Sequence, residues 1–134
     1  MLPLINDRLN FKNPDEASSF VYSGLCQHEP HGRWLVGDKT RIGLKLKTRP
    51  KKMTVKCYSY RNRTRLVYVN GKCAGSLDFT TNSYSHEFDI KNIDVKDCNL
   101  VIDFIHETPI SPLSVGESSD ERMIAVLFDE ICFP

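Results

Sequence analysis

The chain has 134 residues, of which 40% are hydrophobic and 26% are charged, and its formal net charge is +1. These values fit a single globular domain over residues 1–134 that can bury a core. The sequence shows no apolar run long enough for a membrane span and no signal-peptide pattern, which favours a cytoplasmic protein.

Short patterns of alternating apolar and polar residues predict β-strands along most of the chain. After an irregular N-terminal part, the segment SFVYSGL (19–25) reads as a first strand. The runs 41–48 and 53–60 alternate strictly, so one face of each should be buried and the other exposed. The residues expected on the buried faces are Ile42, Leu44, Leu46, Met53, Val55 and Cys57.

An Asn-Gly pair predicts a hairpin in the middle of the chain. Asn70 and Gly71 separate two apolar runs, and this dipeptide favours the positive φ angles of a two-residue turn. Two more alternating runs follow, with Tyr84, His86, Phe88 and Ile90 on one face of the first and Leu100, Ile102, Phe104 and His106 on one face of the second. The last run, MIAVLFDEICF, is apolar on both faces, as a central covered strand would be.

Eight or nine short strands with frequent turn signals predict an all-β fold. The chain length and the uneven connections favour an antiparallel two-sheet β-sandwich of jelly-roll type over a small closed barrel. Residues 105–122 form a long loop rich in Pro, Ser and Gly, and long ordered loops in compact domains are often functional.

The charges are strongly segregated along the chain. Residues 39–77 contain twelve Lys or Arg and no acid, whereas residues 78–134 contain twelve acids and three bases. One interpretation is that basic and acidic strands lie side by side and pair across the sheets. The other is a basic surface for an anionic partner, or a protein-interaction module in which the basic and acidic surfaces of two copies associate.

Five widely spaced cysteines, an odd number, argue against a disulfide framework. Most of them lie within apolar runs, where a free cysteine behaves as a small hydrophobic residue. The pattern therefore indicates reduced thiols in a cytoplasmic protein.

Candidate chemistry concentrates in the segment GLCQHEPHGRW, residues 24–34, which includes the only tryptophan. Its H-E-P-H spacing matches no zinc motif, so no metal site is predicted, and a structural calcium ion has no readable signature. Cys26 lies near His28, but neighbours in an extended segment need not converge as a catalytic pair does. Because there is no nucleophile elbow or phosphate-binding loop, we expect no catalytic activity and no cofactor.

The run KCYSYRNRTR interleaves two tyrosines with basic residues, a pattern that can stack bases and hold the phosphates of single-stranded nucleic acid. Alternation directs Tyr58 and Tyr60 outward if Val55 and Cys57 face the core. Two tyrosines are few for a stacking platform, so nucleic acid is the less favoured partner.

Three segments resemble a family of jelly-roll, galactose-binding-like domains attached to bacterial surface-polysaccharide glycosyltransferases and phosphoglycerol-transferase-like proteins. GLCQHEPHGRW looks like the pattern G-(aromatic or apolar)-x-x-x-E-x-x-G-x-W, ISPLSVGESSDER looks like S-P-x-x-x-G-x-S-x-D-x-R, and VYVNGKCAG is similar to a V-x-V-N-G hairpin. The matching positions outside the hairpin are Gly24, Glu29, Gly32, Arg33, Trp34, Ser111, Pro112, Gly116, Ser118, Asp120 and Arg122. The chain departs from the pattern at Leu25, where an aromatic residue is common.

The resemblance implies a carbohydrate-binding or accessory module of bacterial surface glycan biosynthesis, whose partner is a carbohydrate or a glycan-synthesising enzyme. The segment before Trp34 would cross between the sheets, with the loop before Arg122 beside it. The expected ligand-binding residues are Glu29, His31, Trp34, Asp120 and Arg122. In the alternative, structural interpretation, Trp34 fills the core and a Glu29–Arg122 ion pair fixes the two loops.

Overall fold

The computed structural model describes residues 4–5, 7–12, 21–23, 32–36, 39–59, 65–79, 84–106, 116 and 124–134. At positions 21, 33–36, 59, 124 and 125 it describes the backbone alone. Within these ranges the chain forms ten strands and one 3₁₀ turn, and none of it forms a helix long and apolar enough to span a membrane.

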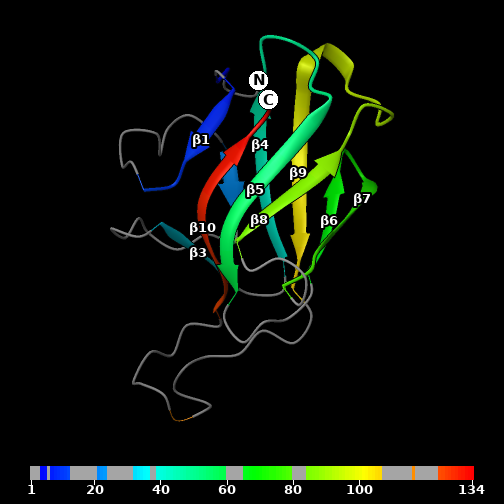
Figure 1. Cartoon of the computed structure of the whole chain (residues 1–134). Coiled ribbons are helices and arrows are strands. Elements are labelled where there is room, and N and C mark those ends of the chain that lie inside the picture. Colours follow the sequence, from blue (N-terminus) through cyan, green and yellow to red (C-terminus); the bar gives the residue numbers. More distant parts are fainter. Residues whose placement is uncertain are drawn as a thin grey trace.

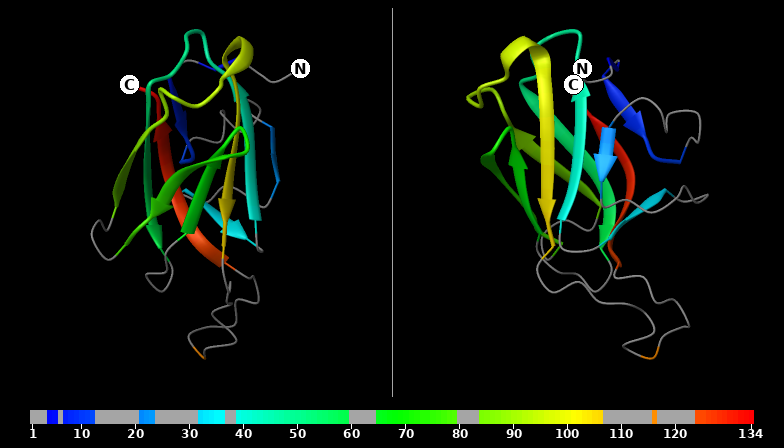
Figure 2. Two further views of the ribbon diagram at one scale, coloured as in Figure 1. Left: turned by 90° about the vertical axis from the view of Figure 1, so that its right-hand side faces the viewer. Right: turned by 180° about the vertical axis from the view of Figure 1, so that it is seen from behind.

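The strands build two antiparallel sheets that pack face to face (Figures 1 and 2). The β9 sheet has the order β2-β4-β9-β6-β7, and the β10 sheet has the order β1-β10-β5-β8, with β3 also beside β10. The strands are β1 (Arg8–Asn10), β2 (Val21–Ser23), β3 (Arg33–Val36), β4 (Lys39–Lys45), β5 (Lys52–Ser59), β6 (Arg65–Val69), β7 (Lys72–Leu77), β8 (Ser85–Asp89), β9 (Asn99–Ile105) and β10 (Ile124–Cys132), and the 3₁₀ turn is η2 (Lys96–Cys98).

The connectivity is that of a jelly roll, because the chain passes repeatedly from one sheet to the other. Apart from the β6–β7 hairpin, each strand is followed by one in the opposite sheet. The predicted all-β, two-sheet antiparallel sandwich is confirmed. Two strands were not predicted, β1 and β3, because segments of three and four residues are too short for alternation to be recognised.

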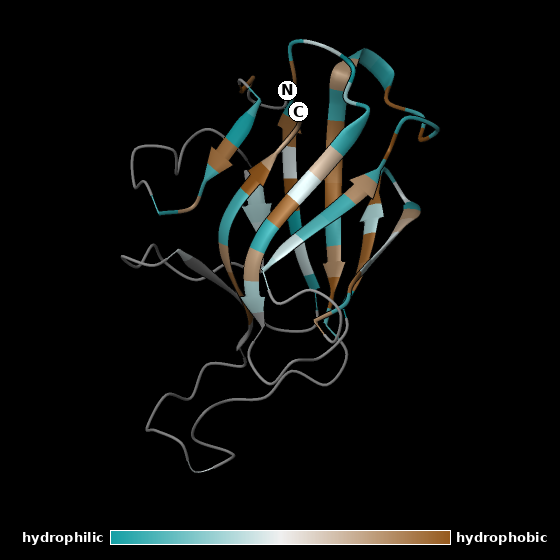
Figure 3. Cartoon of the chain, viewed as in Figure 1, coloured by the Kyte–Doolittle hydropathy of each residue, from teal (hydrophilic) through white to brown (hydrophobic). Residues whose placement is uncertain are grey.

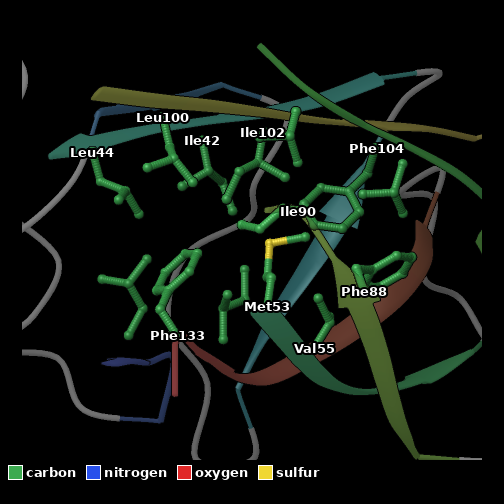
Figure 4. Close-up of a cluster of buried hydrophobic side chains, with 14 of the residues drawn as sticks. Ile42, Leu44, Met53, Val55, Phe88, Ile90, Leu100, Ile102, Phe104 and Phe133 are labelled. Atoms are coloured by element: carbon green, nitrogen blue, oxygen red, sulfur yellow. The ribbon is translucent and has the colours of Figure 1, made fainter. Parts of the chain in front are cut away.

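The core lies between the sheets and is built by the alternation that the sequence shows. Figure 4 shows side chains of β4 and β9 meeting side chains of β5 and β8, and bands of opposite hydropathy alternate along β5 and β8 in Figure 3. The contributing residues include Ile42, Leu44, Met53, Val55, Phe88, Leu100, Ile102 and Phe104, all buried. Each such side chain contributes roughly 1.5–3 kcal/mol by leaving water, which makes this alternation the main determinant of the fold.

The strand β10 is central, as its apolar faces predict. It pairs with β5 along one edge and with β1 and β3 along the other. The Asn-Gly hairpin is also confirmed, since β6 and β7 are joined by Asn70 (φ 51°) and Gly71 (φ 82°). Both angles lie in the region that a tight two-residue hairpin requires.

The segregated charges pair across neighbouring strands, as the first interpretation expects. Arg41 on β4 donates two hydrogen bonds, of 2.7 and 3.0 Å, to Asp103 on β9. Lys52 and Glu87 are 3.0 Å apart across β5 and β8. Basic and acidic halves of the sequence are thus partly interleaved in space, and Lys39, Arg41 and Lys52 each have an acidic partner on a neighbouring strand.

The cysteines follow the expectation only in part. Cys57, Cys73, Cys98 and Cys132 are free thiols, and Cys26 lies outside the described residues. Cys57 is buried, but Cys73 is exposed and the other two are partly exposed. Cys73 differs because it lies on the edge strand β7 just after the hairpin, where no second layer covers it.

Candidate functional site

An exposed tyrosine marks the outer face of the β10 sheet. Tyr58 on β5 follows the buried Cys57 and has 52% of its surface exposed. The ring of Tyr84 lies against it, with the two ring centres 4.8 Å apart and the planes tilted by 39°. Tyr84 was expected on the same face as His86, which is buried, but it precedes the first residue of β8, and its ring lies beside the outward-facing Tyr58 instead.

A β-bulge places a carboxylate beside this aromatic pair. The register between β10 and β5 shifts between Phe128 and Glu130, so Asp129 is the extra residue. Bulges commonly redirect a side chain in this way. The hydroxyl of Tyr84 donates a hydrogen bond to Oδ2 of Asp129, and the ammonium of Lys12 lies 3.0 Å from Oδ1. We call Lys12, Tyr58, Tyr84 and Asp129 the tyrosine face.

The interactions of Asp129 fix the protonation states of its partners. Its hydrogen bond and negative charge raise the pKa of Lys12, which therefore stays cationic. Burial, followed by the hydrogen bond to Asp129, raises the pKa of Tyr84, which therefore stays neutral. At neutral pH the tyrosine face thus combines two neutral rings with a carboxylate and an ammonium group.

Cys132, in the same sheet, has no nucleophilic character. Its thiol donates a 2.6 Å hydrogen bond to Glu130, which Arg8 also contacts at 3.1 Å. Burial, together with the bond to Glu130, raises the pKa of Cys132 to about 11. The thiolate is scarce at neutral pH, so this group does not supply an activated nucleophile.

The predicted ligand-binding residues Glu29, His31, Asp120 and Arg122 lie outside the described residues. Trp34 belongs to β3, where it stands opposite Leu127 in the register, and Leu127 in turn stands opposite Tyr58. The chain changes sheet between β2 and β3, as expected for the segment before Trp34.

The motif glycine before Trp34 has a clear structural role. Gly32 has a φ of +131° and is buried against β10. A Cβ atom built on it would lie 1.9 Å from the carbonyl oxygen of Phe128. No other residue fits this close approach between two backbones, which explains the glycine without a ligand.

The two histidines that alternation placed on the same faces as Phe88 and Phe104 are buried. His106 bonds to Thr40 with a 2.9 Å distance between Nε2 and Oγ1. His86 lies edge-on against Phe79, and burial lowers its pKa although Asp78 partly opposes this. Within the described part of the chain, no three His, Cys, Asp or Glu side chains gather as metal ligands would.

Sequence reasoning found one member of the tyrosine face and missed three. Tyr58 was identified as an outward-facing aromatic residue, but as part of a nucleic-acid pattern. Asp129 carried a weak signal, a charge inside an otherwise apolar strand. Lys12 and Tyr84 carried no such signal. Both contact Asp129, and these contacts depend on the bulge in β10 and on which segments lie beside it.

Comparison with known proteins identifies the fold. No family model matches the sequence, and no curated protein matches it. A solved carbohydrate-binding module, CBM36 in complex with calcium and xylotriose, is similar with a TM-score of 0.52 and 14% identity over 95% of this chain and 98% of that chain. The CBM36-1 domain of a multidomain xylanase from the hindgut metagenome of Trinervitermes trinervoides gives a TM-score of 0.48 and 16% identity over 84% and 88%. The first likeness extends over almost all of both chains and shows a shared jelly-roll fold.

Proposed function

We propose that the protein is a non-catalytic carbohydrate-binding module whose tyrosine face contacts the sugar. The observation that carries the proposal is the exposed ring of Tyr58, supported by Tyr84 and flanked by Asp129 and Lys12. A sugar ring presents C–H groups on its faces and hydroxyls at its edge, so it matches an aromatic surface bordered by polar groups. The fold shared with a module solved with xylotriose supports the same conclusion.

Each member of the tyrosine face has a distinct role in this proposal. Tyr58 provides the stacking surface, and the ring of Tyr84 packs against the ring of Tyr58 and restricts its movement. Asp129 is itself buried, and it positions Tyr84 and Lys12 through its two carboxylate oxygens. Lys12, whose side chain is 46% exposed, has three donor hydrogens and directs some of them to the sugar.

We extend the proposed site to Glu29, His31, Trp34, Asp120 and Arg122. The support for Trp34 is its position in the register, two strands from Tyr58 along the row Trp34, Leu127, Tyr58. The support for the other four is the similarity of their segments to those of the polysaccharide-associated jelly-roll domains. No residue of this set is assigned a catalytic role.

The proposal includes a role in bacterial surface glycan synthesis and a cytoplasmic location. The same segment similarities support an association with enzymes of bacterial surface glycan synthesis. The free thiols of the four described cysteines suit a reducing compartment such as the cytoplasm. Single-stranded nucleic acid is a second candidate ligand, which the exposure of Tyr58 next to the basic Lys56 favours.

Calorimetric titration with xylotriose and a panel of neutral and acidic oligosaccharides tests the proposed function. Tyr58→Ala should weaken binding by roughly tenfold, because it removes the stacking surface. Tyr22→Ala is the matched control, since Tyr22 is a similarly exposed tyrosine on β2, in the opposite sheet. Circular dichroism checks the fold of both variants, and an EDTA-treated sample shows whether binding needs a cation.

Equal losses in the two tyrosine variants would contradict the proposed site. Absence of binding by every oligosaccharide in the panel would contradict the proposed function itself.

A further inference from the structure

Two adjoining pockets lie at the end of the sandwich where β4 leads into β5. The larger has a volume of about 550 Å³ and is lined by Asp7, Leu46, Lys47, Thr48, Arg49, Pro50, Phe133 and Pro134. The smaller, of about 290 Å³, is lined by Asp7, Arg8, Thr54, Lys56, Cys132 and Pro134. They share Asp7 and Pro134 as lining residues, and we call the two pockets together the basic groove.

Among the described residues, the lining of the basic groove holds more cations than carboxylates. Lys47, Arg49 and Lys56 have no carboxylate oxygen within 4.0 Å among these residues, whereas Arg41 and Lys52 do. Lys56 stands opposite Glu130 in the register of β5 and β10, and Glu130 forms its ion pair with Arg8. Arg49 is held at the groove by hydrogen bonds to the carbonyls of Lys91 and Ile93, which orient its guanidinium without cancelling its charge. Among the described residues that line the two pockets, Asp7 is the one acidic residue.

The groove continues the tyrosine face along the same strand. Thr54, Lys56 and Tyr58 alternate with the buried residues of β5, so they share its outer face. Lys56 lies roughly 7 Å and Thr54 roughly 13 Å along the strand from Tyr58. A chain of several sugar units that stacks on Tyr58 and follows β5 would therefore reach the groove.

We propose that the ligand is an acidic oligosaccharide, whose sugar ring stacks on Tyr58 while its anionic groups lie in the basic groove. This proposal rests on the proposed function. Carboxylate or sulfate groups on the chain would pair with Lys47, Arg49 and Lys56, which otherwise expose their charge to water. Thr54, which lines the smaller pocket with Lys56, offers a hydroxyl to the chain's hydroxyls.

The arrangement of aromatic residues favours a glycan over a single-stranded nucleic acid. A nucleic acid would place a base every few ångströms and would need a stacking surface for successive bases. Among the described residues, the one aromatic side chain in the lining of the basic groove is Phe133, and it is buried in the core. Stacking is therefore confined to the tyrosine face, and the cations and hydroxyl that follow it suit a chain that is mostly hydroxyl and carboxylate.

The test compares acidic oligosaccharides with their neutral counterparts. The probes are hexamers of galacturonate and of hyaluronan, each against its methyl ester, with a dodecamer of thymidylate as the nucleic-acid probe. At least one acidic hexamer should bind about tenfold more tightly than its ester, and raising the salt from 50 to 200 mM should reduce this preference.

Paired charge variants locate the effect. Lys47→Gln together with Lys56→Gln should remove most of the preference for the acidic hexamer, because it weakens binding of the acidic hexamer by a larger factor than binding of the ester. Lys72→Gln together with Lys96→Gln is the matched control, because it removes the same charge at exposed positions outside the groove. Tyr58→Ala should weaken binding of the acidic and neutral hexamers alike.

The outcomes separate the two proposals. Equal affinity for hexamer and ester, or equal effects of the two charge variants, would overturn the acidic-ligand proposal while a loss in Tyr58→Ala would still support the proposed function. Failure of every glycan to bind would overturn both. Tighter binding of the thymidylate dodecamer than of any glycan would identify a nucleic-acid site and overturn the acidic-glycan proposal.

Discussion

At the scale of single residues, backbone geometry explains why the segment before Trp34 has a glycine at position 32. The segment before Trp34 contains a glycine because Gly32 passes directly over the carbonyl of Phe128. Phe128 immediately precedes Asp129, the bulge residue of the tyrosine face. Gly32 thus links the motif segment to the strand that carries the candidate site.

Gly32→Ala should destabilise the protein strongly, by more than about 2 kcal/mol, because both the close contact and the positive φ oppose a side chain. Gly71→Ala is the comparison, since Gly71 also has a positive φ but a Cβ there meets nothing within 4 Å. Its cost should be about 1 kcal/mol, the cost of the left-handed conformation alone. Urea unfolding of both variants measures the difference. Equal losses of unfolding free energy in the two variants would show that the close contact with Phe128 does not destabilise Gly32→Ala.

The buried His86 makes stability depend on pH. Burial places its pKa in the folded protein below the value of 6.5 expected in the unfolded chain. Below about pH 6.5 the unfolded chain therefore binds a proton at this histidine, whereas the folded protein keeps it neutral. As the pH is lowered further, the free energy of unfolding falls by up to about 1.4 kcal/mol per pH unit, until the pKa of the folded protein is reached.

His86→Leu should remove this part of the pH dependence. We expect the loss of stability between pH 7.5 and pH 5.5, measured by urea unfolding, to be smaller in the variant than in the wild type. The comparison isolates His86, because Asp78 and the other titrating groups are present in both proteins. The same pH dependence in both proteins would show that His86 is not buried in its neutral form.

At the scale of elements, Asn70 ties the β6–β7 hairpin to β9. Its side-chain amide donates to the carbonyls of Asp94 (3.0 Å) and Asn99 (3.1 Å), and its Oδ1 accepts from the backbone N–H of Val101 at 2.7 Å. The residue thus serves two purposes, the positive φ of the turn and the attachment of the turn to a neighbouring strand.

Replacement of Asn70 should separate these two purposes. Asn70→Ala should cost roughly 2–3 kcal/mol of unfolding free energy, because it loses three hydrogen bonds and disfavours the positive φ. Asn70→Gly should cost less, since it loses the bonds but adopts the turn freely. Thermal or urea unfolding measures both, and a glycine variant as stable as the wild type would show that the three hydrogen bonds contribute nothing.

The same scale shows what the sequence can predict. Alternation identifies the inner face of a strand from its own residues, and it correctly assigned Ile42, Val55 and Phe104 to the core. It cannot give the strand order or the position of a bulge, because these depend on which strands meet. Tyr84 and Asp129 therefore could not be paired from the sequence, although each is visible in it.

At the scale of the whole molecule, the two sheets have different surfaces. The β10 sheet presents an exposed aromatic pair together with the ion pairs Arg8–Glu130 and Lys52–Glu87, and the basic groove lies where β4 leads into β5. On the β9 sheet, Arg41 is neutralised by Asp103 across β4 and β9. The jelly-roll connectivity explains how residues as distant in sequence as Lys12, Tyr58 and Asp129 come together on one face.

The measurement that tests this account most directly is a titration of ¹⁵N-labelled protein with the tightest-binding oligosaccharide of the panel, followed by amide chemical shifts. The account predicts that the largest shifts occur at Lys56, Tyr58 and Asp129, with the amides of β4 and β9 unchanged. Shifts centred on the outer face of the β9 sheet, or the absence of any shift at Tyr58 and Asp129, would contradict it.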